Sequence, residues 1–259
     1  MAHGKLFARL AYVNGRTRLV EHHQSAPLKI ARTFEREDGG LDICIMDASP
    51  GLLAGDHYEI DWVVEPGAKV HITTQGATRV HPSDGPVSKQ QVRFMVGEDA
   101  RLQWWPESTI PFAKARFQSQ LIAHLAPGAE LVLFESLSAG RVARGEVFDF
   151  SCTILEIDVQ DASGPRLFSR NRFEPEKSPL TGHFSWGEAQ QWSSLYVFGY
   201  TANSSHLNDL LGEANVYGAA STLSRGDLAI VMLGKRAHDL RATALKLGTL
   251  LAPVSRETL

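Results

Sequence analysis

The sequence predicts a mainly β protein of stacked strands, either a β-helix-like coil or a sandwich, with two α-helices toward the C-terminal end. Alternating apolar and polar residues dominate the first two-thirds of the 259-residue chain, which is the two-residue period of half-buried strands. Turn dipeptides such as Asn14-Gly15, Pro66-Gly67 and Pro127-Gly128 separate these runs at short intervals. Strands therefore follow one another with no helical stretch between them.

The alternation is clearest at 57–63, where Tyr58, Ile60 and Trp62 fall on one face and polar residues on the other. The same pattern predicts strands around 70–74, 92–96, 129–137 and 148–154. A weak repeat supports stacking, because Ala68, Ala100 and Ala129 each follow a tight turn and open a strand, at spacings of 32 and 29 residues. A period near 30 residues predicts stacked β coils or a sandwich of one repeated unit.

Helical signals are confined to the last quarter of the chain. Ser204-Ser205 is an N-cap for a short helix over 206–211 that ends at Gly212, and apolar residues at three- and four-residue steps predict a second helix over 236–251. The apolar run 228–233 between them is expected to be a buried strand, and 171–186 a long loop. We expect one domain over 1–259, with a β core at about 4–200 and a helical and strand segment at about 201–259.

Composition excludes several classes of protein. Lys and Arg total 26 against 29 Asp and Glu, for a formal net charge of −3, so no basic excess is available for nucleic acid. Cys44 and Cys152 form no CxxC pair, which excludes a disulfide framework or a structural zinc knot and favours a reducing cytoplasm. The run 228–233 is far shorter than the roughly 20 residues of a membrane helix, and the first residues lack the apolar core of a signal peptide, so we expect a soluble cytoplasmic protein without membrane contacts.

No standard catalytic motif is present. The sequence has no Walker loop, GxGxxG or HExxH, and Ser185 fails the nucleophile-elbow pattern because His183 replaces its first glycine. Among ten histidines, His57, His71, His81 and His124 stand singly in strands or turns and are expected to be solvated surface residues. A metal-dependent enzyme on a β-helix or cupin-like scaffold, with scattered histidines converging in space, remains the alternative function, although no HxH pair supports it.

Two charged features are candidates for function. Glu135 shares its strand face with leucines, so this acid is either paired with a nearby Arg141 or Arg144 or faces a hydrated interior. The segment 140–146 places Arg141, Arg144 and Glu146 in a glycine-bracketed turn, where a structural salt bridge is the simplest interpretation of the heptapeptide alone.

Six short motifs occur in a fixed order between residue 4 and about residue 155: Asn14-Gly15-Arg16-Thr17, Ala26-Pro27-Leu28, 49–56, 73–79, 102–107 running into 110–112, and 140–146. Together they resemble the UreD family of urease accessory proteins, also called UreH. Two positions depart from the family pattern: Leu52 stands where a second glycine is common, and Arg79 where lysine is common. The first departure affects the loop before Asp56, and the second retains the positive charge.

The resemblance implies a mostly β protein that is not an enzyme but a scaffold for nickel insertion into apo-urease. It implies binding to apo-urease, to UreF and to UreG, the nickel-carrying GTPase, with nickel in transit through an internal water-filled path and no tightly bound cofactor. A plain scaffold without an ion path has the same partners and remains open.

By position in the matching motifs, the carboxylates expected to hold nickel transiently are those of Asp56, Glu135 and Glu146, and the other path-lining or motif residues are Thr78, Arg79, Arg141 and Arg144. Carboxylates and hydroxyls hold a divalent ion less tightly than clustered imidazoles or thiolates, so the ion can leave again. Apolar surface for a partner is expected between 207 and 251, with Leu240 and Leu247 as candidate contacts.

Overall fold

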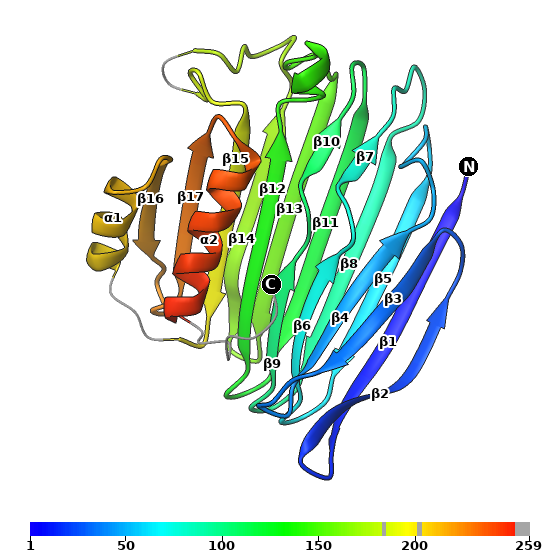
Figure 1. The fold of residues 1–259 in the computed structure, drawn as a ribbon, viewed down its shortest axis with the longest axis vertical. Coiled ribbons are helices and arrows are strands. Elements are labelled where there is room, and N and C mark those ends of the chain that lie inside the picture. The colour runs from blue at the N-terminus through cyan, green and yellow to red at the C-terminus, as the bar shows by residue number, and fades with distance from the viewer. Residues whose placement is uncertain (183–184, 201–203, 252–259) are drawn as a thin grey trace.

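The computed structural model describes residues 1–182, 185–200 and 204–251, and within them the chain forms two facing β-sheets flanked by helices (Figure 1). In spatial order, the seven-stranded sheet contains β14 (Gly164–Phe173), β13 (Cys152–Asp161), β11 (Arg116–Leu125), β8 (Ser88–Val96), β5 (His57–Val64), β1 (His3–Val13) and β2 (Arg16–Gln24).

In spatial order, the main path of the ten-stranded sheet contains β16 (Tyr217–Thr222), β17 (Leu228–Gly234), β15 (Gln191–Phe198), β12 (Glu130–Ser138), β9 (Arg101–Trp105), β6 (Lys69–Thr74), β4 (Leu41–Asp47) and β3 (Leu28–Glu35). Two short strands, β7 (Thr78–Val80) and β10 (Thr109–Pro111), pair with each other, and β10 also pairs with β12.

The chain passes back and forth between the two sheets, so successive strands stack as coils. β4, β6, β9 and β12 run parallel in one sheet, and β5, β8, β11 and β13 run parallel in the other. Antiparallel strands flank these ladders: β2 joins β1, β14 joins β13, and β15 joins β12. The predicted mainly β architecture of stacked strands is confirmed, in its β-helix-like form.

The repeated turns occupy equivalent places in successive coils. The backbone N–H groups of Ala68, Ala100 and Ala129 each donate to the carbonyl three residues earlier, at 3.1 Å in all three cases. The turns also bond to one another, because Arg101 donates its N–H to the carbonyl of Ala68 at 2.8 Å and Glu130 donates to that of Ala100 at 2.9 Å. The weak sequence repeat therefore corresponds to one turn per coil.

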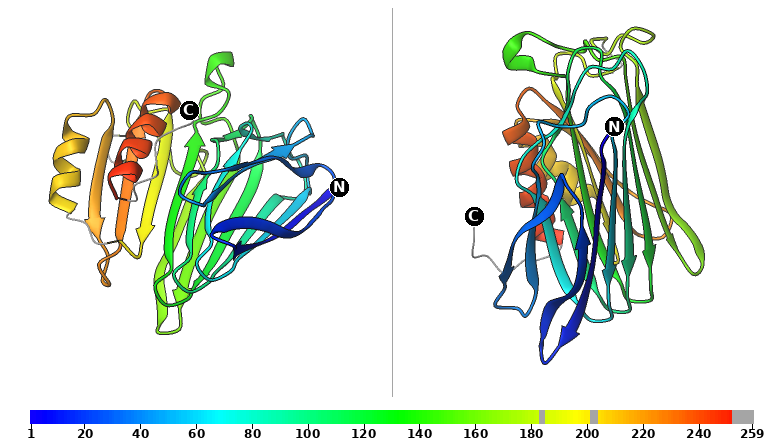
Figure 2. Two further views of the ribbon diagram at one scale, coloured as in Figure 1. Left: turned by 60° about the horizontal axis from the view of Figure 1, so that its bottom comes forward. Right: turned by 90° about the vertical axis from the view of Figure 1, so that its right-hand side faces the viewer.

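Two apolar clusters stabilise the layers. The larger lies between the sheets, where Leu131 and Leu133 of β12 are buried, and the smaller lies between the ten-stranded sheet and the helices, where Val132 and Phe134 of the same strand are buried. Helices α1 (Ser204–Gly212) and α2 (Ala237–Leu251) form where the sequence predicts them, as does the strand at 228–233. Figure 2 shows α2 against the outer side of the ten-stranded sheet.

Two expected boundaries are wrong. The strand predicted over 148–154 begins only at Cys152, because Phe148 adopts a positive φ of 60° and its ring packs instead against Trp186, with centroids 5.1 Å apart. The loop predicted over 171–186 begins only after Phe173, because β14 continues to this residue in register with Thr153 of β13. The Ser185 position lies in that loop, after residues 183–184, which are outside the described residues.

Two further findings concern composition. Cys44 and Cys152 are both free thiols. Of the helices in the described parts of the chain, none has the length and apolar character needed to cross a membrane.

Candidate functional site

Glu135 faces a small cavity between the two sheets. The cavity, about 30 Å³, is lined by Gln90, Ser119 and Leu155 from the seven-stranded sheet and by Trp104 and Ser136 from the ten-stranded sheet, with Glu135 beside them. The Glu135 side chain points inward because the odd-numbered residues of β12 share the face of the leucines in the larger apolar cluster. The expectation that Glu135 interrupts an apolar register is confirmed.

The Glu135 carboxyl group has no charged partner among the described residues. The residue as a whole is half-buried, but its Oε2 is fully enclosed and accepts no hydrogen bond. Burial raises the pKa of Glu135 to about 8, since the charged form is desolvated there, and the hydroxyl of Ser194 on the paired strand opposes this rise. The alternative of a pair between Glu135 and Arg141 or Arg144 is wrong, because neither arginine acts on the Glu135 carboxyl group and Arg141 bonds Glu146 instead.

A larger cavity of about 350 Å³ adjoins this small one. Both are lined by Gln90, Trp104 and Pro106 together with Thr78, so Thr78 stands at their common boundary. Asp47 and Tyr58 line the larger cavity but not the small one, and the Tyr58 hydroxyl donates to Asp47 Oδ2 at 3.1 Å. Burial raises the pKa of Tyr58, which keeps it a neutral donor.

A third, more open cavity of about 600 Å³ lies beside the turn 140–146 and shares Arg79 with the second cavity. The short 3₁₀ helix η1 (Val142–Arg144) brings Arg141 and Arg144 to its wall. Arg141 bonds both carboxylate oxygens of Glu146, with Nε to Oε2 at 2.8 Å, and stacks over Phe112 at 4.0 Å.

The predicted salt bridge in the turn 140–146 is confirmed, and it joins Arg141 to Glu146. The Glu146 carboxylate also accepts the backbone N–H of Ala113 at 3.1 Å, which ties the turn to the neighbouring loop. The Arg141 guanidinium holds the pKa of Glu146 below its usual range. Glu146 is thus a charged carboxylate already engaged on both oxygens.

Asp56 occupies a different place. It is buried at the end of the loop before β5, where Oδ1 accepts the N–H of Ala2 at 2.5 Å and Oδ2 accepts that of Leu53 at 2.9 Å. Asp56 lines none of these three cavities, so Thr78, Arg79 and Glu135 are joined through shared walls while Asp56 lies apart. A role for any of these residues toward nickel stays a prediction.

The loop before Asp56 shows what the two sequence departures do. Gly51 has a φ of 129°, and a Cβ there would lie 2.4 Å from the carbonyl oxygen of Arg79, so glycine is required at this position. Leu52 is fully buried and its N–H bonds the Arg79 carbonyl at 2.9 Å. The departure at Leu52 therefore adds to the core, while the Arg79 side chain stays exposed.

The two leucines expected to contact a partner are in the interior. Leu240 and Leu247 lie on the buried face of α2, in the smaller apolar cluster that covers β12, β15 and β17. Their side chains hold the helix on the sheet and are not exposed in this structure, because the apolar stripe of an amphipathic helix packs onto the nearest apolar face. Partner binding by this segment stays a prediction.

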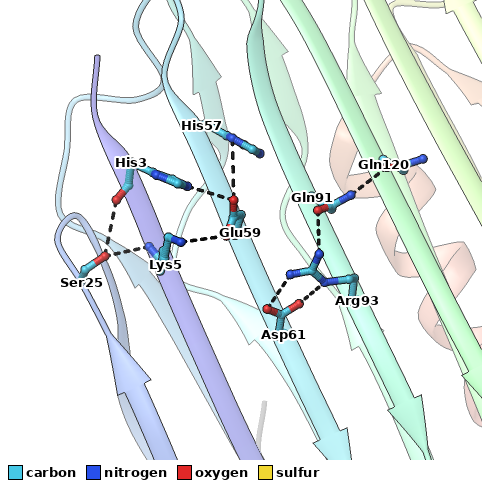
Figure 3. A network of polar contacts seen from close by, with 9 residues as sticks. All are labelled: His3, Lys5, Ser25, His57, Glu59, Asp61, Gln91, Arg93 and Gln120. Atoms are coloured by element: carbon cyan, nitrogen blue, oxygen red, sulfur yellow. Dashed lines mark hydrogen bonds and ion pairs between the residues drawn. The ribbon is translucent and has the colours of Figure 1, made fainter.

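Sequence reasoning missed one cluster on the outer face of the seven-stranded sheet. His3, His57 and Glu59 place their ligand-type atoms within 4.8 Å of one another (Figure 3). The pair His57 and Glu59 is visible in the sequence as alternate residues of one strand, but His3 reaches them only because β1 pairs with β5. No local pattern in the sequence indicates that pairing.

Comparisons with known proteins agree on one family. The family model described as "UreD urease accessory protein" matches residues 2–258. A urease accessory protein UreD of Deinococcus radiodurans is 39% identical over 66% of this chain and 62% of its own length. One of Herpetosiphon aurantiacus is 30% identical over 93% and 88%, and a urease accessory protein UreH of Helicobacter acinonychis is 25% identical over 92% and 90%.

Proposed function

Since this chain belongs to the UreD family of urease accessory proteins, with a role in urease maturation, we propose that it is the scaffold on which nickel is inserted into apo-urease. In this role it binds apo-urease together with UreF and UreG, and it catalyses no reaction of its own. The two free thiols suit a reducing cytoplasm as its place of action.

The observation that carries the ion path is the Oε2 atom of Glu135, which is enclosed and accepts no hydrogen bond, in a residue that lines the cavity between the sheets. Buried polar groups are nearly always bonded to protein or water, so an enclosed carboxyl oxygen without a protein partner marks a hydrated interior or a cation position. Oxygen ligands hold Ni²⁺ more weakly than clustered imidazoles or thiolates, which permits release. Nickel is the cargo in this proposal and passes Glu135 without remaining there.

Electrostatics favours one direction from Glu135. The adjoining 350 Å³ cavity is lined by Thr78 and offers the carboxylate of Asp47 beside Arg79, whereas the third cavity shares Arg79 and adds Arg141 and Arg144. A divalent cation is repelled by guanidinium groups, which cannot lose their charge at neutral pH. We therefore assign the path to the side of Asp47 and assign the arginine-lined cavity to contact with acidic groups of a partner.

A matched pair of substitutions on β12 tests the path. Glu135→Gln removes the interior carboxyl group, which can give up its proton to bind a cation, without changing side-chain size. Glu130→Gln removes a carboxylate from the other face of the same strand, where it pairs with Arg101. Each variant is co-expressed with urease subunits, UreF and UreG, and the complex and the nickel content of purified urease are measured. We expect intact complexes for both and reduced nickel only for Glu135→Gln.

Other results separate the alternatives. Normal nickel content with Glu135→Gln would contradict the ion path and leave a plain scaffold. Failure of the unmodified chain to co-purify with UreF or urease would contradict the scaffold itself. The rival function, a metal-dependent enzyme, requires tight stoichiometric metal at a site enclosed in a cavity, and the histidine cluster of the described residues instead lies on an outer sheet face.

A further inference from the structure

Three metal-ligating side chains meet on the outer face of the seven-stranded sheet. The parallel register of β1 and β5 sets His3 beside His57, and the strand period sets Glu59 on the same face as His57. His3 Nε2 lies 3.0 Å from Glu59 Oε1, and His57 Nδ1 lies 3.9 Å from the same oxygen. The two imidazole rings stack with centroids 5.1 Å apart (Figure 3).

These separations suit a metal ion with little rearrangement. Bonds of about 2.0 to 2.2 Å from a metal to imidazole nitrogen and carboxylate oxygen place ligand atoms roughly 3 to 3.5 Å apart. The ligand atoms here all lie within 4.8 Å of one another, on three side chains that are half-buried to exposed. Rotation of the imidazoles about their side-chain bonds is enough to close the difference, and the remaining coordination positions face solvent.

Neighbouring contacts hold the ligands in place. Lys5 Nζ lies 3.2 Å from Glu59 Oε2, which leaves Oε1 turned toward the histidines. The backbone is fixed as well: His57 donates its N–H to the Ala2 carbonyl at 3.0 Å, and Lys5 donates its N–H to Ser25 Oγ at 2.8 Å. Ligands on paired strands keep their relative positions better than ligands on loops.

The Glu59 carboxylate presents one oxygen to each side: Oε1 lies 3.0 Å from His3 Nε2, and Oε2 lies 3.2 Å from Lys5 Nζ. Lys5 weakens the local attraction for a cation, but its contact is to the other carboxylate oxygen and its side chain is more than half exposed, at 58%. The charge of the carboxylate is therefore available through Oε1.

We propose that His3, His57 and Glu59 form a surface site for one divalent first-row transition-metal ion, of the class of Zn²⁺ and Ni²⁺. Two imidazole nitrogens and one carboxylate favour these ions over Mg²⁺ and Ca²⁺, which prefer all-oxygen ligands. Solvent-facing positions make the site exchangeable. This site does not depend on the proposed role in urease maturation, because it is defined by the cluster alone.

The test is a titration of the purified full-length chain, carrying no histidine tag, with Ni²⁺ and separately with Zn²⁺, followed by calorimetry. We expect one equivalent of metal to bind at least tenfold more weakly in His57→Ala, in Glu59→Gln and in His3→Ala. The control is His23→Ala. His23 is an exposed histidine on the neighbouring strand β2, and its Nε2 lies 3.3 Å from Glu21 Oε1, but it belongs to no cluster of three ligands among the described residues. This control should bind metal as the unmodified chain does.

A spectroscopic reading identifies the ligands. Electron paramagnetic resonance of bound Cu²⁺ should show coupling to two imidazole nitrogens in the unmodified chain and to one in His57→Ala. Binding by His3 and the backbone amides before it would survive His57→Ala and Glu59→Gln, and that result would overturn the site. Equal titrations of the unmodified chain and the His3→Ala, His57→Ala double variant would overturn it as well.

The outcome is separable from the proposed function. Nickel content of matured urease is measured on the same variants, with thermal melts to confirm folding. Loss of the metal equivalent with normal urease nickel supports this site and leaves the proposed function intact. Failed maturation by the unmodified chain, beside an unchanged calorimetric result, would contradict the proposed function and leave this site in place.

Discussion

Replacing Glu135 with glutamine should change how the stability of the chain depends on pH. Burial raises the folded-state pKa of Glu135 from 4.5 to about 8. Below the unfolded pKa the group is protonated in both states and costs nothing. As the pH rises from about 4.5 to about 8, the unfolded chain loses this proton while the folded chain retains it, so the free energy of unfolding falls. Glutamine has no such proton.

The size of the effect follows from the pKa difference. One pKa unit corresponds to about 1.4 kcal/mol, so between pH 5 and pH 7.5 the wild-type chain should lose about 3 kcal/mol of stability relative to Glu135→Gln. The physical cause is desolvation of the charged carboxylate, whose Oε2 is enclosed. Any constant cost of burying the glutamine amide shifts the variant equally at every pH and cancels in this comparison.

The assay is urea unfolding followed by tryptophan fluorescence at a series of pH values from 5 to 8. Wild type and Glu135→Gln are compared, and Glu130→Gln, which loses its ion pair with Arg101, serves as a control for removing a carboxylate from the same strand. A difference between wild type and Glu135→Gln that stays constant with pH would refute the reasoning. It would mean that Glu135 ionises normally in the folded chain and is fully hydrated or paired.

Three further changes have clear expectations. Glu146→Gln should melt within a few degrees of wild type, because its ion pair is partly exposed and glutamine can keep the hydrogen bond from Ala113, and urease nickel content would reveal any additional role. Arg166→Met should cost about 3 kcal/mol in urea unfolding, since it leaves a buried aspartate unpaired, whereas Arg93→Met at an exposed pair should cost about 1 kcal/mol or less. Gly97→Ala should destabilise by about 1 to 3 kcal/mol, because the added Cβ would lie 2.7 Å from the backbone of the preceding coil, and Gly85→Ala, with open space around it, should not.

The strands could be predicted because each buries one face. Tyr58, Ile60 and Trp62 alternate with polar residues, and all three are buried in the structure. The repeated alanine turns predicted the stacking, because every coil needs a tight turn at the same place. Phe148 was assigned to a strand wrongly, since alternation cannot reveal a positive φ that is imposed by the turn before it.

The candidate site was predictable only in part. Glu135 could be identified because an acid among leucines breaks an apolar face, and this signal is local. The partners of Asp56 could not be identified, since its carboxylate bonds the backbone of Ala2 and Leu53, and backbone groups leave no mark in the sequence. The burial of Leu240 could not be predicted either, because the apolar face of an amphipathic helix can pack equally on its own sheet or on a partner protein.

The same two-residue period explains why interior and surface chemistry are separate in this fold. A strand of a coil turns alternate residues inward and outward, so Tyr58 enters the core while His57 and Glu59 face solvent, and Glu135 enters the cavity between the sheets. The inner position offers oxygen ligands, and the outer cluster offers mainly nitrogen ligands, which bind Ni²⁺ and Zn²⁺ more tightly. Because the two positions share no contact partners, the effects of His57→Ala and Glu135→Gln on metal binding and on stability should add. Coupling between them would mean that an ion at one position alters the other, and the two could no longer be treated as independent.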